Sequence, residues 1–383
     1  MTALNESMET SINQVFTILP DPRKERNQRH LFLDVVTIAI VSVLCGCDDW
    51  LEITAFAQAR EDWFRQFLTL PNRIPSVDTF RRVFRFLDHR AFEKCFMKWT
   101  EQVCALTRGK IVSIDGKLLR GTRETSGSVQ TVCIISAFAA ENSMVLGQLA
   151  TEAKSNEITA IPLLLEMLDI EDAIVTIDAA GCQKEIARKI IEKGGDYVFG
   201  LKGNQQTLHD EAENFFNQAF AAKFKYLKVD HFHTEEQSRN RYEVRDVYVV
   251  DDLDWLEVKN DWDGLMSLVI VRSQRTINEK TSTEDRYYIS SLPSNAEQIG
   301  QAIRSHWTVE NKLHWVLDVA YREDLCKSRK DNGAQNFSVL RRMTTNLIRQ
   351  HKQKNTKIKG GVKCRRKVAA WSDAYLQELL ECK

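Results

Sequence analysis

Two short apolar runs that each stop at an aspartate constrain the fold of this chain most. Ile111 to Ile114 is followed by Asp115, and Ala173 to Ile177 is followed by Asp178. Short runs that are rich in β-branched residues are typical of buried strands. We therefore predict that each aspartate is the last residue of a strand, with its carboxylate at the rim of a sheet.

A third acid, Glu310, lies in a segment with helical spacing of its apolar residues. These residues recur at steps of four, six and four, at Ile303, Trp307, Leu313 and Leu317. The spacing predicts a helix in which the charge of Glu310 faces inward, where a carboxylate is costly unless something positive neutralises it. Two strand-end aspartates and this glutamate would form an oxygen-rich cage for Mg²⁺, the hard cation that suits phosphate chemistry.

The composition allows a large core but indicates no partner. At 383 residues with 43% hydrophobic composition, the chain is long enough for two or three domains. Lysines plus arginines and aspartates plus glutamates both number 53, so a nucleic-acid surface would have to come from local clustering of charge.

The cysteines and the apolar segments indicate a reducing cytoplasm and no membrane. Nine cysteines occur at scattered spacings, and the tightest pair, Cys45-Gly46-Cys47, lacks the two-residue spacer of a redox motif, so free thiols are expected. The most apolar segment, Leu31 to Cys47, is too short to span a membrane and contains Asp34. Its spacing predicts a buried helix. The polar first residues carry no export signal.

Residues 1–108 are predicted to form an N-terminal helical domain that associates with DNA. A loop with two prolines, Leu70 to Ser76, ends one helix, and Ser76 is predicted to cap the next. That helix and its flank carry one basic patch, made of Arg81, Arg82, Arg85 and Arg90. A solvated helix face and a DNA contact both fit this pattern, and the sequence does not decide between them.

From Lys110 the pattern changes from helices to strands. Three strand-like runs follow in succession: Ile111–Asp115, Thr131–Phe138 and Met144–Ala150. A helix, the strand that ends in Asp178, a second helix and a fifth strand come next. This mixed α/β order resembles the ribonuclease-H-like fold. In that fold the first and fourth strands are neighbours at the centre of the sheet, which would bring Asp115 and Asp178 together.

The remaining chain is predicted to divide into four further parts. Residues 109–204 form the first part of the ribonuclease-H-like core, and residues 205–300 a β-rich insertion with strands at 242–250, 265–272 and 286–292. Residues 301–348 form the second part of the core with the helix of Glu310, and residues 349–383 a basic C-terminal region. Between 349 and 367 there are nine lysines and arginines and no acid. Such a run is usually a solvated face, and binding of a phosphate backbone competes with that interpretation.

Four short segments carry a joint pattern: Ser113-Ile-Asp-Gly-Lys-Leu-Leu-Arg-Gly121, Lys154-Ser-Asn-Glu-Ile158, Thr176-Ile-Asp-Ala-Ala-Gly-Cys-Gln183 and Tyr197-Val-Phe-Gly-Leu-Lys-Gly-Asn-Gln205. Ile74 to Phe80 precedes them, and His306 to Val319, with Glu323-Asp324, follows them. Together these segments strongly resemble bacterial insertion-sequence transposases of the DDE superfamily, and within it the H-repeat-associated proteins. The resemblance covers residues 15–350.

The resemblance implies a cut-and-paste transposase that hydrolyses and rejoins DNA strands with Mg²⁺, or with Mn²⁺ in its place. By motif position, Asp115, Asp178 and Glu310 would be the catalytic, metal-binding triad. It also implies double-stranded DNA as the partner, at element ends and at the target, with a homodimer in the end complex and a place at the bacterial nucleoid. Candidates for DNA contact are Lys117, Lys202, Asn204, Arg304, Lys312, Arg365 and Arg366. Related transposases often carry tyrosine, arginine and lysine around the glutamate, and Ile303, His306 and Leu317 stand there instead.

Three other readings remain open. His306, Glu310 and His314 follow one another at steps of four, which also fits a transition-metal site, although histidines packed on a helical core are more common. A catalytically inactive, element-derived DNA-binding protein would keep the basic patches without the chemistry. A general metal-dependent nuclease of the same fold would cut arbitrary DNA with no preference for element ends.

Overall fold

The computed structural model describes residues 15–103, 110–122, 131–151, 157–238, 240–354 and 358–381. The chain divides into two compact units, which are described separately. The first unit contains residues 1–106, 116–156 and 310–383, and the second contains residues 107–115 and 157–309. Among the described helices, none combines the length and the apolar character that crossing a membrane would require.

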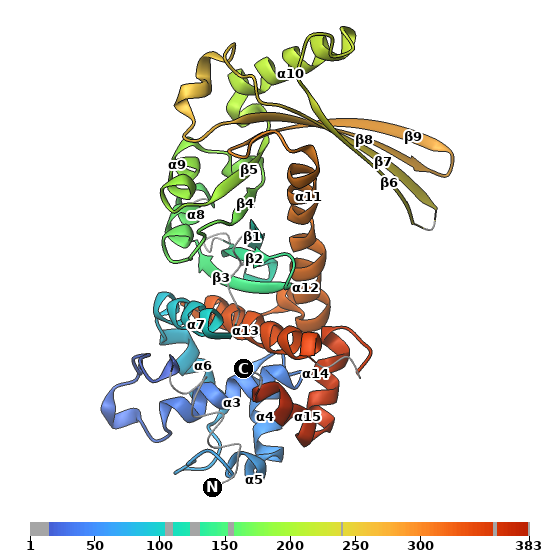
Figure 1. Cartoon of the computed structure of the whole chain (residues 1–383). Helices are drawn as coiled ribbons and strands as arrows, with labels where there is room; N and C mark the ends of the chain where they lie inside the picture. The colour runs from blue at the N-terminus through green and yellow to red at the C-terminus, as the bar shows by residue number, and fades with distance from the viewer. Residues whose placement is uncertain are drawn as a thin grey trace. The chain divides into compact units, whose positions relative to one another are not determined.

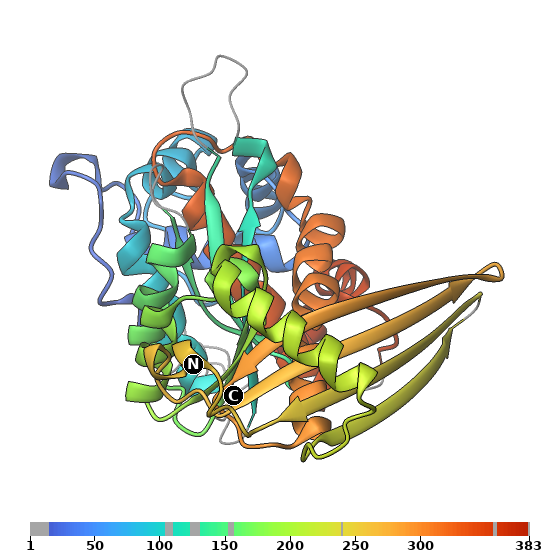
Figure 2. The same ribbon diagram turned by 90° about the horizontal axis from the view of Figure 1, so that it is seen from above.

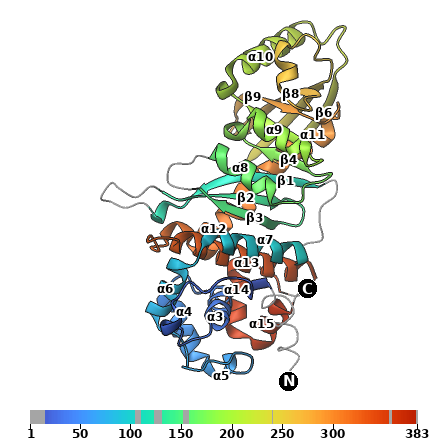
Figure 3. The same cartoon turned by 90° about the vertical axis from the view of Figure 1, so that its left-hand side faces the viewer.

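The first unit is built on a buried helix, α3 (Phe32–Leu44), which confirms the buried helix predicted there. Every residue from Asp34 to Leu44 is buried because other helices of the unit surround α3, and Figure 3 shows it among α4, α14 and α15. The further helices of this unit are α4 (Trp50–Ala59), α5 (Glu61–Phe64), α6 (Val77–Phe86), α7 (His89–Val103), α12 (Trp315–Tyr321), α13 (Gly333–Lys354), α14 (Val362–Trp371) and α15 (Asp373–Leu380). Ser76 caps α6, as predicted, with its hydroxyl accepting from the backbone N–H of Thr79 at 3.3 Å.

Two antiparallel strands, β2 (Cys133–Ala139) and β3 (Met144–Ala150), complete the first unit together with the end of β1 (Ile111–Leu118), in the order β3-β2-β1. Helices α7 and α13 pack on β3, and α13 also packs on α3 and α6. β2 and β3 are both buried along their whole length, which explains their continuous apolar sequences.

In the second unit the strand order is β1-β4-β5-β9-β8-β7-β6. Strands β1, β4 (Ile174–Ile177) and β5 (Asp196–Leu201) are parallel. Helices α8 (Glu157–Glu166) and α9 (Lys184–Glu192) lie on one side of these strands, and α11 (Ala296–His306) lies on the other (Figure 1). The element order and the pairing of β1 with β4 confirm the mixed α/β, ribonuclease-H-like core.

Residues 206–290 extend the sheet of the second unit. After α10 (Gln206–Ala221) come β6 (Asp230–Ser238), β7 (Arg241–Val250), β8 (Ser267–Ile277) and β9 (Lys280–Ser290). Strand β9 pairs antiparallel with β5, so the insertion adds strands to the core sheet. Figure 2 shows the ends of these long hairpins reaching beyond α10. The three predicted strands correspond to β7, β8 and β9, whereas β6 and α10 were not predicted.

Candidate functional site

Asp115 and Asp178 come from neighbouring parallel strands of the second unit. β1 and β4 pair in register from Ile111 opposite Ile174 to Ile114 opposite Ile177, so the next residue on each strand is one of the two aspartates. Adjacent strands lie about 4.8 Å apart. The prediction that these two strands are neighbours is therefore confirmed, and each aspartate follows the last register pair of the two strands.

The local backbone differs at the two aspartates. Asp178 directly follows the last residue of β4, as predicted, and caps the short 3₁₀ turn Ala179–Gly181. Its Oδ1 accepts from the backbone N–H of Ala180 at 3.1 Å and of Gly181 at 3.4 Å, which fixes the direction of an exposed carboxylate. The prediction that Asp115 ends its strand is wrong, because β1 continues to Leu118. Asp115 is half-buried within the strand.

A chain of polar contacts lies two residues before the aspartates. Ser113 and Thr176 are register partners, and the Thr176 hydroxyl donates to the Ser113 hydroxyl at 3.1 Å. His306, the last residue of α11, places Nδ1 3.2 Å from the Thr176 hydroxyl oxygen. Because side chains alternate along a strand, Asp115 and Asp178 face the same side of the sheet as this chain of contacts, the side that α11 covers.

Burial lowers the pKa of His306 below its ordinary value, although the charge of Asp178 and a hydrogen bond with the backbone of Thr176 act to raise it. The imidazole is therefore neutral at neutral pH and is held against β4. The sequence showed His306 only as part of an alternative transition-metal site. Its contact with Thr176 could not be read from spacing, since 130 residues separate the two.

Glu310 lies in the first unit, at the start of a π-helical segment, Glu310–His314, that precedes α12. The prediction of one continuous helix with an inward glutamate is wrong, because Glu310 is exposed and α11 ends at His306. Within this segment a carboxylate oxygen of Glu310 and a ring nitrogen of His314 lie within 4.8 Å of each other. Single π-helical turns inside α-helices often mark functional positions.

Two side chains that follow β5 donate hydrogen bonds to the backbone of the loop that begins at Asp178. The side-chain amide of Asn204 donates to the backbone oxygen of Ala179 at 2.7 Å, and that of Gln205 donates to the oxygen of Cys182 at 2.9 Å. Gly200 is needed for this close approach, since a β-carbon there would lie 3.2 Å from the backbone nitrogen of Ala179. Lys202 is exposed on the loop that follows β5.

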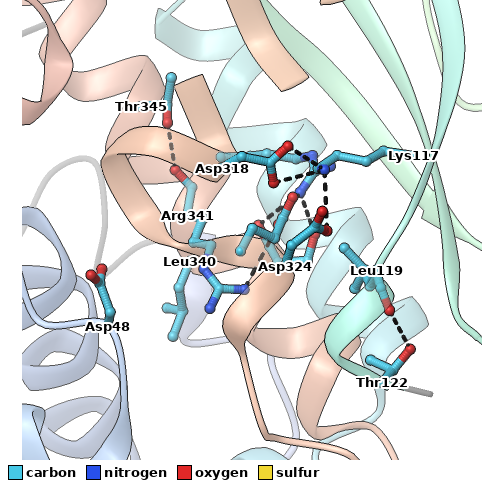
Figure 4. A network of polar contacts seen from close by, with 12 residues as sticks. Asp48, Lys117, Leu119, Thr122, Asp318, Asp324, Leu340, Arg341 and Thr345 are labelled. Atoms are coloured by element: carbon cyan, nitrogen blue, oxygen red, sulfur yellow. Dashed lines mark hydrogen bonds and ion pairs between the residues drawn. The ribbon is translucent and has the colours of Figure 1, made fainter. Parts of the chain in front are cut away.

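Lys117 is buried in the first unit and paired with two acids (Figure 4). Its ammonium group lies 2.8 Å from a carboxylate oxygen of Asp318 and 3.4 Å from one of Asp324. Four residues further on, a β-carbon at Gly121 would come within 2.7 Å of the backbone oxygen of Asp324. These contacts give the motif around Lys117 a structural role, and its predicted contact with DNA stays a prediction that burial argues against.

Arg365 and Arg366 are also buried and bonded inside the first unit. Arg366 donates to the backbone oxygen of Val43 at 2.9 Å and to Asp48 at 2.7 Å, so it satisfies the carboxyl end of α3. Arg365 donates to the hydroxyl of Tyr375 at 3.2 Å. Both arginines were predicted to contact DNA. That role stays a prediction, and the burial of both side chains does not support it.

The other cationic candidates are exposed, and some have acidic partners. Arg304 pairs with Glu236 of β6 in the second unit, and Lys312 is exposed in the π-helical segment of the first. In the basic patch of α6 and α7, Arg81 pairs with Asp78, Arg85 with Asp331, and Arg90 with Glu93. Of the two interpretations of this patch, these ion pairs favour a solvated helix face over a DNA contact.

Cys45 and Cys47 are both buried, and neither forms a disulfide bond. Burial raises the pKa of the Cys45 thiol to about 12 and that of Cys47 further still. A thiol that stays protonated is a poor nucleophile, so a redox couple at this position is not supported.

Carboxylate oxygens dominate the donor set of this site. Asp115 and Asp178 follow register partners on adjacent strands and offer carboxylate oxygens, and His306 is occupied by its contact with Thr176. Oxygen ligands suit a hard divalent cation better than a transition metal. The residues present therefore fit a Mg²⁺-type ion.

Comparisons with known proteins identify two regions of the chain. Residues 107–347 match the family described as "Transposase DDE domain", and residues 13–100 match the family described as "DDE_Tnp_1-associated". The Escherichia coli O157:H7 protein named "Putative transposase YncI" is 40% identical over 97% of this chain and 94% of its own length. The Escherichia coli K12 protein named "H repeat-associated putative transposase YhhI" is 37% identical over 95% of this chain and 96% of its own length.

Proposed function

The chain belongs to the family of transposases with a DDE domain, and from this premise we propose that it cuts DNA at element ends and joins the freed strands to a target. One observation carries the proposal. Two carboxylates that the motif pattern singles out, Asp115 and Asp178, follow register partners on adjacent parallel strands. The substrate would be double-stranded DNA, and two copies of the chain would act on paired ends in the bacterial nucleoid.

We assign the third carboxylate to Glu310. Its segment begins four residues after His306, which contacts Thr176 of β4. Four residues of chain span at most about 14 Å, so chain length permits Glu310 to act with the aspartates. The π-helical turn that begins at Glu310 adds support, because such turns are frequent at functional positions.

Asp115, Asp178 and Glu310 would hold Mg²⁺, with Mn²⁺ as a substitute. When bound, these cations would generate a strong nucleophile from water or a 3′-hydroxyl and stabilise the leaving oxygen of the phosphodiester. The chain's own contribution is orientation. The turn at Ala179–Gly181 holds Oδ1 of Asp178 through two backbone N–H groups, which fixes the carboxylate and keeps Oδ2 out of these two bonds.

DNA contact would fall to exposed groups near these acids. Lys202 sits on the loop that Asn204 ties to the backbone of Ala179, directly after Asp178. An ammonium group so placed can neutralise a phosphate of the cut strand. Arg304 and Lys312 are further candidates, although Arg304 would have to exchange its pair with Glu236 for a phosphate.

The test is strand cleavage of a DNA duplex that carries the terminal repeats found beside the gene. Asp115→Asn and Asp178→Asn should each reduce cleavage in Mg²⁺ at least about 1000-fold, because one carboxylate ligand is lost, while binding to the repeats is kept. Glu185→Gln is the matched control, since Glu185 is an exposed acid on α9 of the same unit.

Three outcomes would contradict parts of the proposal. Wild-type cleavage by either asparagine variant refutes the site. Wild-type protein that binds the repeats without cutting them in Mg²⁺ or Mn²⁺ indicates an inactive DNA-binding protein. Cutting of unrelated duplexes at the same rate indicates a general nuclease.

A further inference from the structure

Two histidines and an aspartate converge on the hairpin of β6 and β7, in the second unit. His231 and His233 are two residues apart on β6, and Asp246 of β7 is the register partner of His233. A single oxygen, Oδ1 of Asp246, lies 2.8 Å from Nε2 of His231 and 2.8 Å from Nδ1 of His233. Three donor atoms of the kinds that bind metals therefore point at one small volume.

This cluster is separate from the acids of the proposed catalytic site. Phe232 and Val247 pack on the buried cluster that includes α11, so the alternating neighbours His231, His233 and Asp246 lie on the opposite face of the sheet. Strands β4, β5, β9 and β8 stand between β1 and β7 in the strand order. Both histidines are partly exposed, with 42% and 46% of their side chains accessible.

A second carboxylate orients His233. Its Nε2 lies 3.1 Å from Oε1 of Glu235, and the hydroxyl of Tyr242 donates to Oε2 of the same glutamate at 2.5 Å. An Nε2–H that donates to Glu235 leaves the lone pair of Nδ1 directed at Asp246. The contact of Nδ1 with Asp246 therefore requires either a second ring proton, which makes the ring a cation that donates to both carboxylates, or a metal ion bound to Nδ1.

His231 is positioned by stacking. Its ring lies on Tyr248 with centroids 4.4 Å apart and planes 11° apart, and Tyr248 in turn stacks on Phe224 with centroids 5.1 Å apart. Fixed rings lose little conformational freedom when they bind an ion. Asp246 Oδ1 can accept hydrogen bonds from N–H groups of both histidines, which hold the set together even without an ion.

We propose that His231, His233 and Asp246 bind one Zn²⁺ ion, with Glu235 as the outer carboxylate that orients His233. Tetrahedral zinc with bonds near 2.0 Å needs ligand atoms about 3.3 Å apart, so the 2.8 Å contacts would open by about half an ångström. Solvent would supply the fourth ligand. Imidazole nitrogens favour zinc over Mg²⁺, so this site and the carboxylate site select different ions.

Bound zinc would cross-link β6 to β7 in the half of the hairpin that lies away from its turn. β6 is the last strand in the order and has few buried side chains, so β7 is the one strand that pairs with it among the described residues. An ion that binds only the folded hairpin stabilises it by mass action. The role is therefore structural, and its test does not require DNA cleavage.

The test is titration calorimetry with ZnCl₂, in the background of Asp115→Asn and Asp178→Asn so that the proposed catalytic ligands do not contribute. His231→Ala, His233→Ala and Asp246→Asn should each abolish the tightest binding step, which should have a stoichiometry of one. Glu235→Gln should weaken that step roughly 10–100-fold, as expected for a residue that orients a ligand. Co²⁺ bound in place of zinc should give the visible absorption of a tetrahedral nitrogen–oxygen site.

His209→Ala is the matched control. His209 lies with Asp210 and Glu213 in another acidic group, on α10. Its substitution should leave the tightest zinc-binding step unchanged. Circular dichroism checks folding, which exposed substitutions on β6 should preserve. Equal zinc affinity for the background protein and its His231→Ala/His233→Ala derivative would overturn the proposal, and so would a loss of affinity in His209→Ala alone. Either result would leave the proposed catalytic site untouched.

Discussion

Glu93 is a carboxylic acid buried between α7 and β3, and burial raises its pKa from 4.5 to about 7 despite the nearby charge of Arg90. Its Oε1 accepts from the backbone N–H of Ala150 at 2.9 Å. The folded state therefore binds a proton that the unfolded state releases between pH 4.5 and 7, so stability falls as the pH rises through this window, by up to roughly 3 kcal/mol. Glu93→Gln keeps the acceptor oxygen and should remove this dependence.

Urea unfolding at pH 5.5 and pH 8 measures the effect. The variant should be the more stable protein at pH 8, and Glu101→Gln, on the exposed side of the same helix, should behave as the wild type. Parallel pH profiles for wild type and Glu93→Gln would contradict the burial argument.

At the residue scale, the sequence predicted the positions that follow from the order of the strands. It did not predict the roles of side chains whose bonding partners are distant in the chain. The neighbourhood of Asp115 and Asp178 follows from which strands pair, so the element pattern was enough. The charge of Lys117 looked available to DNA because its partner Asp318 is 201 residues away in the chain. Arg366 was predicted to contact DNA for the same reason, because its partner, the backbone oxygen of Val43, is 323 residues away in the chain. Charge alone does not tell a buried ion pair from a phosphate contact.

At the element scale, the π-helical turn Glu310–His314 is the least regular part of the proposed site. Deleting Asn311 would remove the extra residue, let the α-helix continue, and rotate Glu310 relative to α12. Cleavage should then fall at least about 100-fold, because misplacement of a catalytic group by an ångström has effects of that size. Asn311→Ala, which keeps the chain length at an exposed position, should cleave as the wild type does. Thermal melting should show both variants folded, and a deletion variant that cuts at the wild-type rate would contradict the assignment.

The elements that the sequence did not predict share a physical cause. β6 has the sequence Asp230 to Ser238, in which Phe232 is the one large apolar side chain, and its exposed pattern gives no alternation to recognise. Its extended form comes from pairing with β7. The apolar spacing from Ile303 to Leu317 predicted one continuous helix, whereas the chain forms α11, a π-helical segment and α12, because periodicity carries no information on a single inserted residue.

At the scale of the whole molecule, the chain passes between the two units four times, after residues 106, 115, 156 and 309. The parts predicted from the sequence follow one another along the chain, whereas the compact units are interleaved. Compactness depends on contacts between residues far apart in sequence, which composition and spacing do not reveal. Asp115 and Glu310 both stand next to such crossings, so the predicted triad is drawn from both units.

The charge balance of the whole molecule makes a last prediction. Because Lys plus Arg equals Asp plus Glu at 53, DNA must be held by local groups. In the basic C-terminal region, Arg365 and Arg366 are buried, but Lys363 and Lys367 are exposed one turn apart on α14 and form a local basic group. Lys363→Gln with Lys367→Gln should weaken DNA binding and reduce the slope of log affinity against log salt by about 2, since each phosphate contact contributes about 0.9. Lys184→Gln, at a lysine paired with Asp261 at 2.7 Å, is the matched control and should leave the slope unchanged. An unchanged slope in the double variant would show that these lysines are only a solvated helix face.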